Sequence, residues 1–125
     1  MNIIHEKEAK ANVFAGQFAR TIRHMTASLG SKNIWMGIIE YEPYCTSNMH
    51  AHAGQEEIFY CIQGQGEVIV DGETRELKPG TCVYVPPKAK HQIINKSSGI
   101  LKVLSAVSPP FSDEQFAKDH QLRDD

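Results

Sequence analysis

Short runs of β-branched, aromatic and aliphatic residues, separated by turn-forming residues, dominate the middle of this chain. Apolar and polar side chains alternate in several of these runs, which is typical of strands with one buried face. Strands are predicted at residues 34–41, 58–62, 67–70, 74–77, 81–85, 91–95 and 100–107. Short strands in such regular succession indicate an all-β sandwich or barrel.

Strong turn signals occupy the gaps between these strands. Asp71-Gly72 is a preferred two-residue hairpin turn. Pro79-Gly80 suits a type II turn, in which the third residue has a positive φ. Pro86-Pro87 ends the preceding strand, because proline donates no backbone hydrogen bond.

The two ends of the chain follow other patterns. Near the start, EKEAKANVF predicts either a helical turn or a loose arm. Near the end, Ser112 precedes Gln115 by three residues, a weak capping-box signature that predicts a short helix within residues 112–120. Residues 121–125 are expected to form a frayed tail.

Length, composition and charge exclude several classes of protein. The 125 residues are 41% apolar and 22% charged, which suits one globular domain over residues 1–125. The net charge of −2 provides no basic field for nucleic acid. No apolar run approaches the roughly 20 residues of a membrane span. The charged start of the sequence has no long apolar stretch, so we expect no secretory signal. We therefore expect a cytoplasmic protein without nucleic-acid or membrane partners.

The cysteines are Cys45, Cys61 and Cys82, and none of them belongs to a C-x-x-C pair. An odd number argues against a disulfide framework and fits a reducing cytosol. We predict three unpaired cysteines that serve as small buried hydrophobic residues.

Ionisable side chains are concentrated in the stretch HAHAGQEE. His50 and His52 are two residues apart, so both side chains lie on one face of an extended segment. Alternation along the next strand separates Glu57 from Glu56, and His91 opens a further strand. Either these groups are solvated surface residues, as lone histidines and acid pairs usually are, or the inward faces of a barrel bring three imidazoles and a carboxylate together.

Two longer patterns contain these residues: YCTSNMHAHAGQEEIFYCIQG at 44–64 and GTCVYVPPKAKHQIIN at 80–95. They resemble the two motifs of the cupin superfamily, G-x5-H-x-H-x3or4-E-x6-G and G-x5-P-x-G-x2-H-x3-N. The motif positions that match at the right spacing are His50, His52, Glu57, Gly64, Gly80, Pro86, His91 and Asn95. Because each residue type occurs at roughly one position in twenty, chance agreement at all of them is very improbable.

Two residues depart from the motifs. Tyr44 stands at the leading glycine of the first motif, and Lys88 stands at a glycine of the second. That second glycine usually allows a tight turn before the histidine strand. We therefore expect a changed turn ahead of His91, although neither departure removes a candidate ligand.

The resemblance implies an all-β double-stranded β-helix, which is the jelly-roll or cupin barrel, with a short C-terminal helix. The motif core would span 44–95, the strands about 13–107, and the C-terminal helix and tail 112–125. The resemblance also implies a homodimer, commonly formed by exchange of an N-terminal strand. Residues 13–25 are the candidate segment for that exchange.

The resemblance further implies one divalent transition metal per chain, held by His50, His52, Glu57 and His91. Glu57 is preferred to Glu56 because only Glu57 has the motif spacing to Gly64. Imidazole and carboxylate ligands suit Fe, Mn, Co, Ni, Cu or Zn and disfavour Ca or Mg. A dication with one carboxylate retains a charge of about +1, which attracts an anionic or chelating small molecule.

The leading prediction is a metalloenzyme that acts on a small polar or anionic metabolite, with an Fe(II)-type dioxygenase, an oxidoreductase, as the first candidate. A metal-dependent isomerase, lyase or decarboxylase follows. The alternative of another class is a non-catalytic module that binds or senses a small molecule, because a fold does not fix a function. The sequence assigns no catalytic residue.

Several other residues have two interpretations. Phe59, Cys61 and Ile93 share a face with the predicted ligands, so they line either a pocket or an ordinary core. Arg20 and Arg23 either bind a substrate carboxylate or are solvated strand charges.

Three histidines lie outside both motifs: His5, His24 and His120. Since isolated histidines are usually surface groups, we predict that all three lie at the surface or in an interface.

Overall fold

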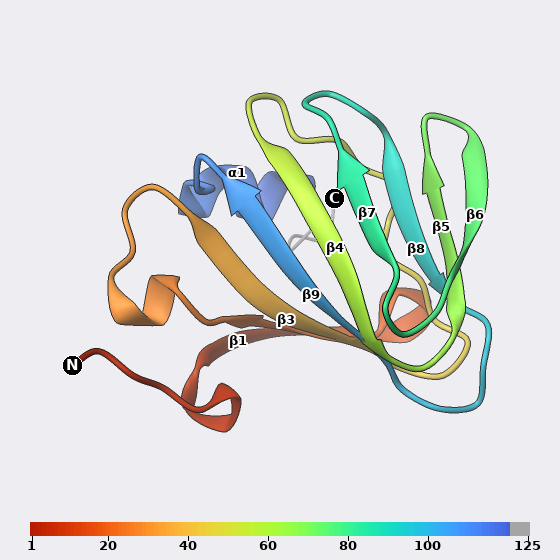
Figure 1. The fold of residues 1–125 in the computed structure, drawn as a ribbon, viewed down its shortest axis with the longest axis horizontal. Coiled ribbons are helices and arrows are strands. Elements are labelled where there is room, and N and C mark those ends of the chain that lie inside the picture. Colours follow the sequence, from red (N-terminus) through yellow and green to blue (C-terminus); the bar gives the residue numbers. More distant parts are fainter. Residues whose placement is uncertain (121–125) are drawn as a thin grey trace.

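The computed structural model describes residues 1–120, and strands dominate it (Figure 1). Its strands and helix are β1 (Lys10–Phe14), β2 (Arg20–His24), β3 (Trp35–Tyr41), β4 (Glu56–Gln63), β5 (Gly66–Val70), β6 (Glu73–Leu77), β7 (Cys82–Val85), β8 (His91–Asn95), β9 (Leu101–Ser108) and α1 (Asp113–Asp119). Short 3-10 turns occupy Glu6–Glu8, Gly16–Phe18 and Ala27–Leu29. Each strand predicted from the sequence is present.

Two antiparallel sheets form the barrel. The larger has the strand order β1-β2-β3-β9-β4-β7, and the smaller has the order β6-β5-β8. The chain before β4 extends the smaller sheet, because Thr46 and His50 form isolated bridges with Ile94 and His91 of β8. The all-β jelly-roll prediction is confirmed (Figure 1).

Alternation along the strands separates core from surface. In β4, Glu57, Phe59 and Cys61 are buried while the residues between them are exposed. In β9 the buried positions are Leu101, Val103, Ser105 and Val107. The inward faces of the two sheets therefore enclose a core into which one carboxylate and one hydroxyl also project.

The N-terminal segment is more regular than a loose arm. A 3-10 turn at Glu6–Glu8 leads into β1, which pairs with β2 and forms one edge of the larger sheet. Residues 13–25, the candidates for strand exchange, thus belong mainly to two strands that pair within this chain. The homodimer stays a prediction.

The turns confirm the local sequence signals. Asp71 and Gly72 have φ values of 46° and 82°, as a type I′ hairpin turn requires. Gly80 has a φ of 91°, the positive value expected after Pro79 in a type II turn.

Tyr44 and Lys88 keep a left-handed backbone although they replace motif glycines. Their φ values are 58° and 70°, a region that glycine enters at no steric cost. Lys88 therefore adopts the conformation suited to glycine, and its backbone N–H donates to the carbonyl of His52 at 2.9 Å. This bond connects the turn before β8 to the segment that carries two of the candidate ligands.

The predicted C-terminal helix is present as α1. The Ser112 hydroxyl accepts from the backbone N–H of Gln115 at 3.0 Å, which is the N-cap bond that the sequence predicted. Figure 1 shows α1 at the end of the barrel where β9 ends and β4 begins. The predicted frayed tail at 121–125 lies outside the described residues. Among residues 1–120, no helix is long and apolar enough to cross a membrane.

All three cysteines are free, as predicted, but only Cys61 is buried. Cys45 is half-buried, and Cys82 at the start of β7 is exposed. The prediction of three buried cysteines is therefore wrong, because Cys82 occupies an outward-facing strand position.

Candidate metal centre

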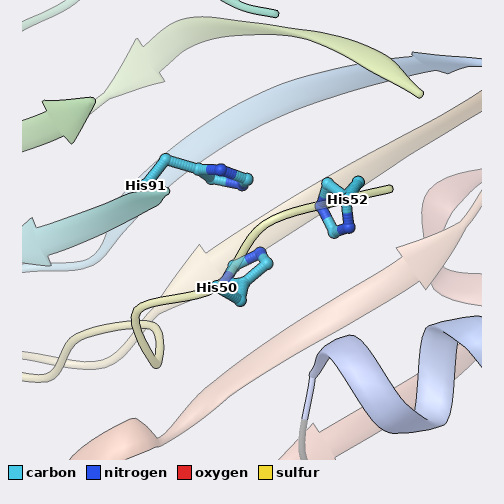
Figure 2. Close-up of side chains that lie close together, drawn as sticks. All are labelled: His50, His52 and His91. Carbon is cyan, nitrogen blue, oxygen red and sulfur yellow. The ribbon is translucent and has the colours of Figure 1, made fainter. Parts of the chain in front are cut away.

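Three histidines from two chain segments meet at the end of the barrel that α1 covers. His50 and His52 lie on the extended segment before β4, and His91 is the first residue of β8. The backbones of His50 and His91 exchange two hydrogen bonds, with N···O distances of 3.0 and 2.8 Å. One ring nitrogen from each histidine lies within 4.8 Å of the other two (Figure 2).

Glu57 is the carboxylate beside this cluster. Its Oε1 lies 3.2 Å from Nε2 of His52 and 3.2 Å from Nε2 of His91. The buried Ser105 hydroxyl donates to its Oε2 at 2.6 Å and so fixes the orientation of the carboxylate. Glu56 is exposed on the other face of β4, as predicted.

Each histidine of the cluster has its Nδ1 paired with an oxygen that only accepts. Nδ1 of His50 donates to the carbonyl of Asn48 at 2.7 Å, and Nδ1 of His91 donates to the carbonyl of Ala89 at 3.0 Å. Nδ1 of His52 lies 2.8 Å from Oδ2 of Asp119. In the neutral ring, these bonds place the hydrogen on Nδ1 and leave a lone pair on Nε2.

Three buried polar atoms in the cluster have no hydrogen-bond partner: Nε2 of His52, Nε2 of His91 and Oε1 of Glu57. The 3.2 Å contacts among them lack hydrogen-bond geometry. A buried polar group without a partner costs about 1–3 kcal/mol, so native proteins retain few of them. A cation between these atoms would satisfy all three, so the donor set fits a metal ion.

The protonation states also suit a cation. Burial would raise the pKa of Glu57, but the contacts with His52 and His91 outweigh it and hold the pKa well below its usual range. Burial, reinforced by His91 and His120, lowers the pKa of His50 well below its usual value. At neutral pH Glu57 is therefore ionised and His50 is neutral, which are the forms that bind metals.

His52 differs from His50 in its charge environment. Burial would lower its pKa, but Glu57 and Asp119 on its two sides outweigh burial and raise the pKa. A metal must therefore compete with a proton at this ring more than at His50.

We predicted that His120 lies at the surface or in an interface. The surface prediction is wrong, because His120 is buried. His120 is 7% exposed. The centroid of its ring lies 4.9 Å from that of His50 and 5.4 Å from that of His52. Its Nδ1 bonds the carbonyl of Phe116 at 3.0 Å, and burial lowers its pKa to about 4. The burial of His120 could not be predicted from the sequence, because α1 folds back over the barrel and no local pattern encodes that contact.

His24 is also not a simple surface group, whereas His5 is exposed as predicted. Nδ1 of His24 accepts from the Trp35 indole N–H at 3.1 Å, and its Nε2 bonds Oδ1 of Asn12 at 2.6 Å. Its ring packs edge-on against Phe116. Both of its nitrogens are satisfied, so His24 is a structural histidine.

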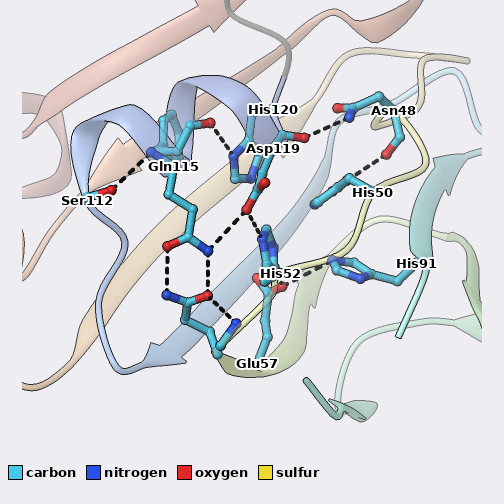
Figure 3. Close-up of polar contacts among 12 residues, drawn as sticks. Asn48, His50, His52, Glu57, His91, Ser112, Gln115, Asp119 and His120 are labelled. Carbon is cyan, nitrogen blue, oxygen red and sulfur yellow. Dashed lines mark hydrogen bonds and ion pairs between the residues drawn. The ribbon is translucent and has the colours of Figure 1, made fainter. Parts of the chain in front are cut away.

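Asn48 connects several parts of the site and was also missed. Its Oδ1 accepts from Nη2 of Arg20 at 3.0 Å. Its Nδ2 donates to the carbonyl of Asp119 at 2.9 Å (Figure 3). Arg20 is 1% exposed and its guanidinium lies 4.0 Å from the centroid of the Phe14 ring. Arg20 is therefore a buried cation next to the site, and Arg23 instead pairs with Glu40 at 2.9 Å.

The remaining sequence candidates belong to the core. Phe59, Cys61 and Ile93 are buried in the main hydrophobic cluster, although the Phe59 ring lies 5.9 Å from the His91 ring. The role of Ser105 could have been predicted from the sequence, because Ser105 places a hydroxyl at an inward position of an otherwise apolar strand face.

A groove of about 840 Å³ lies between the N-terminal strands and α1, and none of the four candidate ligands lines it. Trp35, Phe111 and Phe116 line it together with Asn12 and Lys10. The Phe111 ring also lies 4.7 Å from the His52 ring, so one side chain contacts both the groove and the candidate metal centre.

Fold and site together define a small jelly-roll protein with a candidate metal centre, and comparison with known families places its fold in a family. The cupin domain family matches residues 37–107, so the chain belongs to the cupins. This match includes all four candidate ligands, His50, His52, Glu57 and His91.

Individual relatives extend the comparison. An uncharacterised protein of Methanocaldococcus jannaschii is 41% identical over 66 residues, which are 53% of each chain. A glucose-6-phosphate isomerase of Thermococcus gammatolerans is 35% identical over 57 residues, which are 42% of this chain and 30% of the isomerase. The matches thus cover about half or less of these relatives.

Among solved structures, a predicted oxalate decarboxylase of Thermotoga maritima superposes with a TM-score of 0.75. Its sequence is 18% identical, and the superposition covers 86% of this chain and 99% of that protein. At this identity the likeness concerns the fold.

Proposed function

We propose that this chain is a metal-dependent enzyme that acts on a small polar or anionic metabolite. One observation carries the proposal: three histidine nitrogens converge beside a carboxylate, and three of the atoms that face one another are buried without partners. A core that needed only stability would replace such groups with apolar side chains, because each unpaired group is costly.

The proposed ligands are His50, His52, His91 and Glu57, which together hold one divalent transition metal. Such an ion would act as a Lewis acid on a carbonyl or hydroxyl oxygen of the substrate. The chain prepares the donors: Ser105 fixes Glu57, and carbonyl or carboxylate oxygens hold each Nδ1.

Isomerase, lyase or decarboxylase chemistry is the proposed reaction class. The similarity to a glucose-6-phosphate isomerase supports this class over oxygenation, although it covers only 42% of this chain. A Lewis acid that stabilises negative charge developing next to a carbonyl would serve each of these reactions. The Fe(II)-type dioxygenase stays a prediction.

The test begins with the metal. The full chain is stripped with a chelator, loaded separately with Mn²⁺, Fe²⁺, Co²⁺, Ni²⁺ or Zn²⁺, and analysed for bound metal. We expect about one ion per chain, lost in a His50→Ala/His52→Ala variant and retained in a His5→Ala control. Loaded protein is then assayed on phosphorylated sugars and on hydroxy and keto acids.

Activity that requires the metal and disappears in the double variant would support the proposal. Activity that persists in the metal-free double variant would refute it. Tight binding of a sugar phosphate or acid without metal and without turnover would instead identify a non-catalytic binding module.

A further inference from the structure

The last turn of α1 contacts the candidate metal centre from outside the barrel. Oδ2 of Asp119 lies 2.8 Å from Nδ1 of His52, although the two residues are 67 positions apart in the chain (Figure 3). The side chain of His52 is 2% exposed and that of Asp119 is 13% exposed, so water screens this contact only partly.

Asp119 is itself held in place from two directions. Its Oδ2 also accepts from Nε2 of Gln115 at 3.3 Å, and its carbonyl accepts from Nδ2 of Asn48 at 2.9 Å. Gln115 in turn exchanges two amide hydrogen bonds with Gln55, at 2.9 and 2.6 Å. The carboxylate is therefore pre-oriented by contacts that do not involve His52.

The three site histidines are not held alike. Backbone carbonyls accept from Nδ1 of His50 and of His91, and these carbonyls belong to residues two positions before each histidine. His52 alone relies on a side chain from a distant element. Its tautomer and ring orientation thus depend on α1, whereas those of the other two are set locally.

We propose that α1 is part of the metal centre and that Asp119 is the positioning residue that keeps the hydrogen of His52 on Nδ1 and directs Nε2 at the metal. This inference rests on the proposed metal site and extends it to an element outside both cupin motifs. A carboxylate that accepts from a ligand imidazole fixes the ring and increases its basicity, and its loss typically weakens metal binding 10- to 100-fold.

The test uses the full chain with Asp119→Ala, Asp119→Asn and a matched control, Glu114→Ala, which removes an exposed carboxylate from the same helix. Two readouts are taken: the dissociation constant for Co²⁺ with its visible absorption spectrum, and the tautomer of each histidine from long-range ¹H–¹⁵N spectra of metal-free protein. The asparagine variant keeps an acceptor oxygen and the size of the side chain, so it separates loss of charge from loss of the contact.

We expect Asp119→Ala to raise the Co²⁺ dissociation constant about 10- to 100-fold, to alter the absorption spectrum, and to mix the tautomers of His52 but not those of His50 or His91. Asp119→Asn should restore the His52 tautomer and most of the affinity, and Glu114→Ala should match the wild type.

Two results would overturn the inference. In a wild type that binds Co²⁺, an Asp119→Ala variant with unchanged affinity, spectrum and His52 tautomer would show that α1 only covers the barrel. Equal changes at all three histidines would show a general loss of structure instead of positioning. A wild type that binds no metal ion would refute the proposed function itself, which is a distinct outcome.

Discussion

The two ends of β8 carry buried polar residues of the same motif in opposite states. His91 at the start of the strand has no hydrogen-bond partner for Nε2. Asn95, four residues later, donates from Nδ2 to the carbonyls of Tyr41, Glu42 and Gly99 at 3.1, 3.1 and 2.8 Å. Its Oδ1 accepts from the backbone N–H and the hydroxyl of Ser97, both at 3.0 Å.

Both residues are 1% exposed, so burial does not distinguish them. The presence or absence of hydrogen-bond partners distinguishes them. A buried amide with every partner inside the chain stabilises the fold, whereas a buried imidazole nitrogen without one destabilises it unless something binds there. Motif membership alone therefore does not separate folding residues from candidate ligands, whereas unmet hydrogen bonds distinguish His91 from Asn95.

The strongest test of this contrast substitutes one residue at each end of β8. His91→Gln should weaken metal binding about a thousandfold. The metal-free protein should keep its free energy of unfolding within about 1 kcal/mol, because removal of the unpaired Nε2 offsets loss of the bond from Nδ1 to Ala89. Asn95→Ala should lower the free energy of unfolding by about 3 kcal/mol, because the carbonyls of Tyr41, Glu42 and Gly99 all lose their donor.

Metal titration and urea unfolding of both variants measure this contrast. In folded Asn95→Ala we expect a metal affinity within about twofold of the wild type, since its contacts lie at the other end of β8. A large loss of metal affinity in Asn95→Ala together with little loss in His91→Gln would contradict the division.

Local pattern accounts for the barrel and for the four candidate ligands. His50, His52 and Glu57 could be placed on one face because side chains alternate along extended chain, and His91 followed from motif spacing. Asp119, His120 and Asn48 could not be predicted, because their contacts join α1 to a segment about 70 residues away and leave no periodic signal in the sequence. The same limit explains the misplacement of Cys82, whose exposure depends on the face that β7 presents.

His24 provides a smaller, pH-dependent test, since it is a histidine with both nitrogens satisfied. Burial, reinforced by Lys10 and opposed by Asp113, lowers the pKa of His24. A histidine with a lowered folded pKa contributes stability that is present above its unfolded pKa of about 6.5 and is lost as the pH falls through the folded value. Protonation of Nδ1 also removes the acceptor for Trp35.

Trp35 is the only tryptophan, so its fluorescence reports this bond. Between pH 7.5 and 5 we expect the emission to change below about pH 6.5 in the wild type and to stay constant in His24→Phe. Zn²⁺ added at pH 7 should leave the emission unchanged, because His24 has no free nitrogen to offer. A pH profile that His24→Phe does not alter would exclude His24 as its source.

The smallest expected effect concerns Lys88, in the turn before β8. Its left-handed backbone costs a side-chain-bearing residue about 1 kcal/mol, so Lys88→Gly should raise the free energy of unfolding by no more than about that amount. Lys90→Gly, the same substitution two positions later without a positive φ, should instead lower the free energy of unfolding by about 0.5–1 kcal/mol.

Metal affinity should not change in Lys88→Gly, because glycine retains the N–H that donates to His52. Denaturant midpoints and a Co²⁺ titration of both variants decide the matter: equal midpoints would mean that this backbone carries no strain, and a lower affinity in Lys88→Gly would mean that the lysine side chain, and not only its backbone, serves the site.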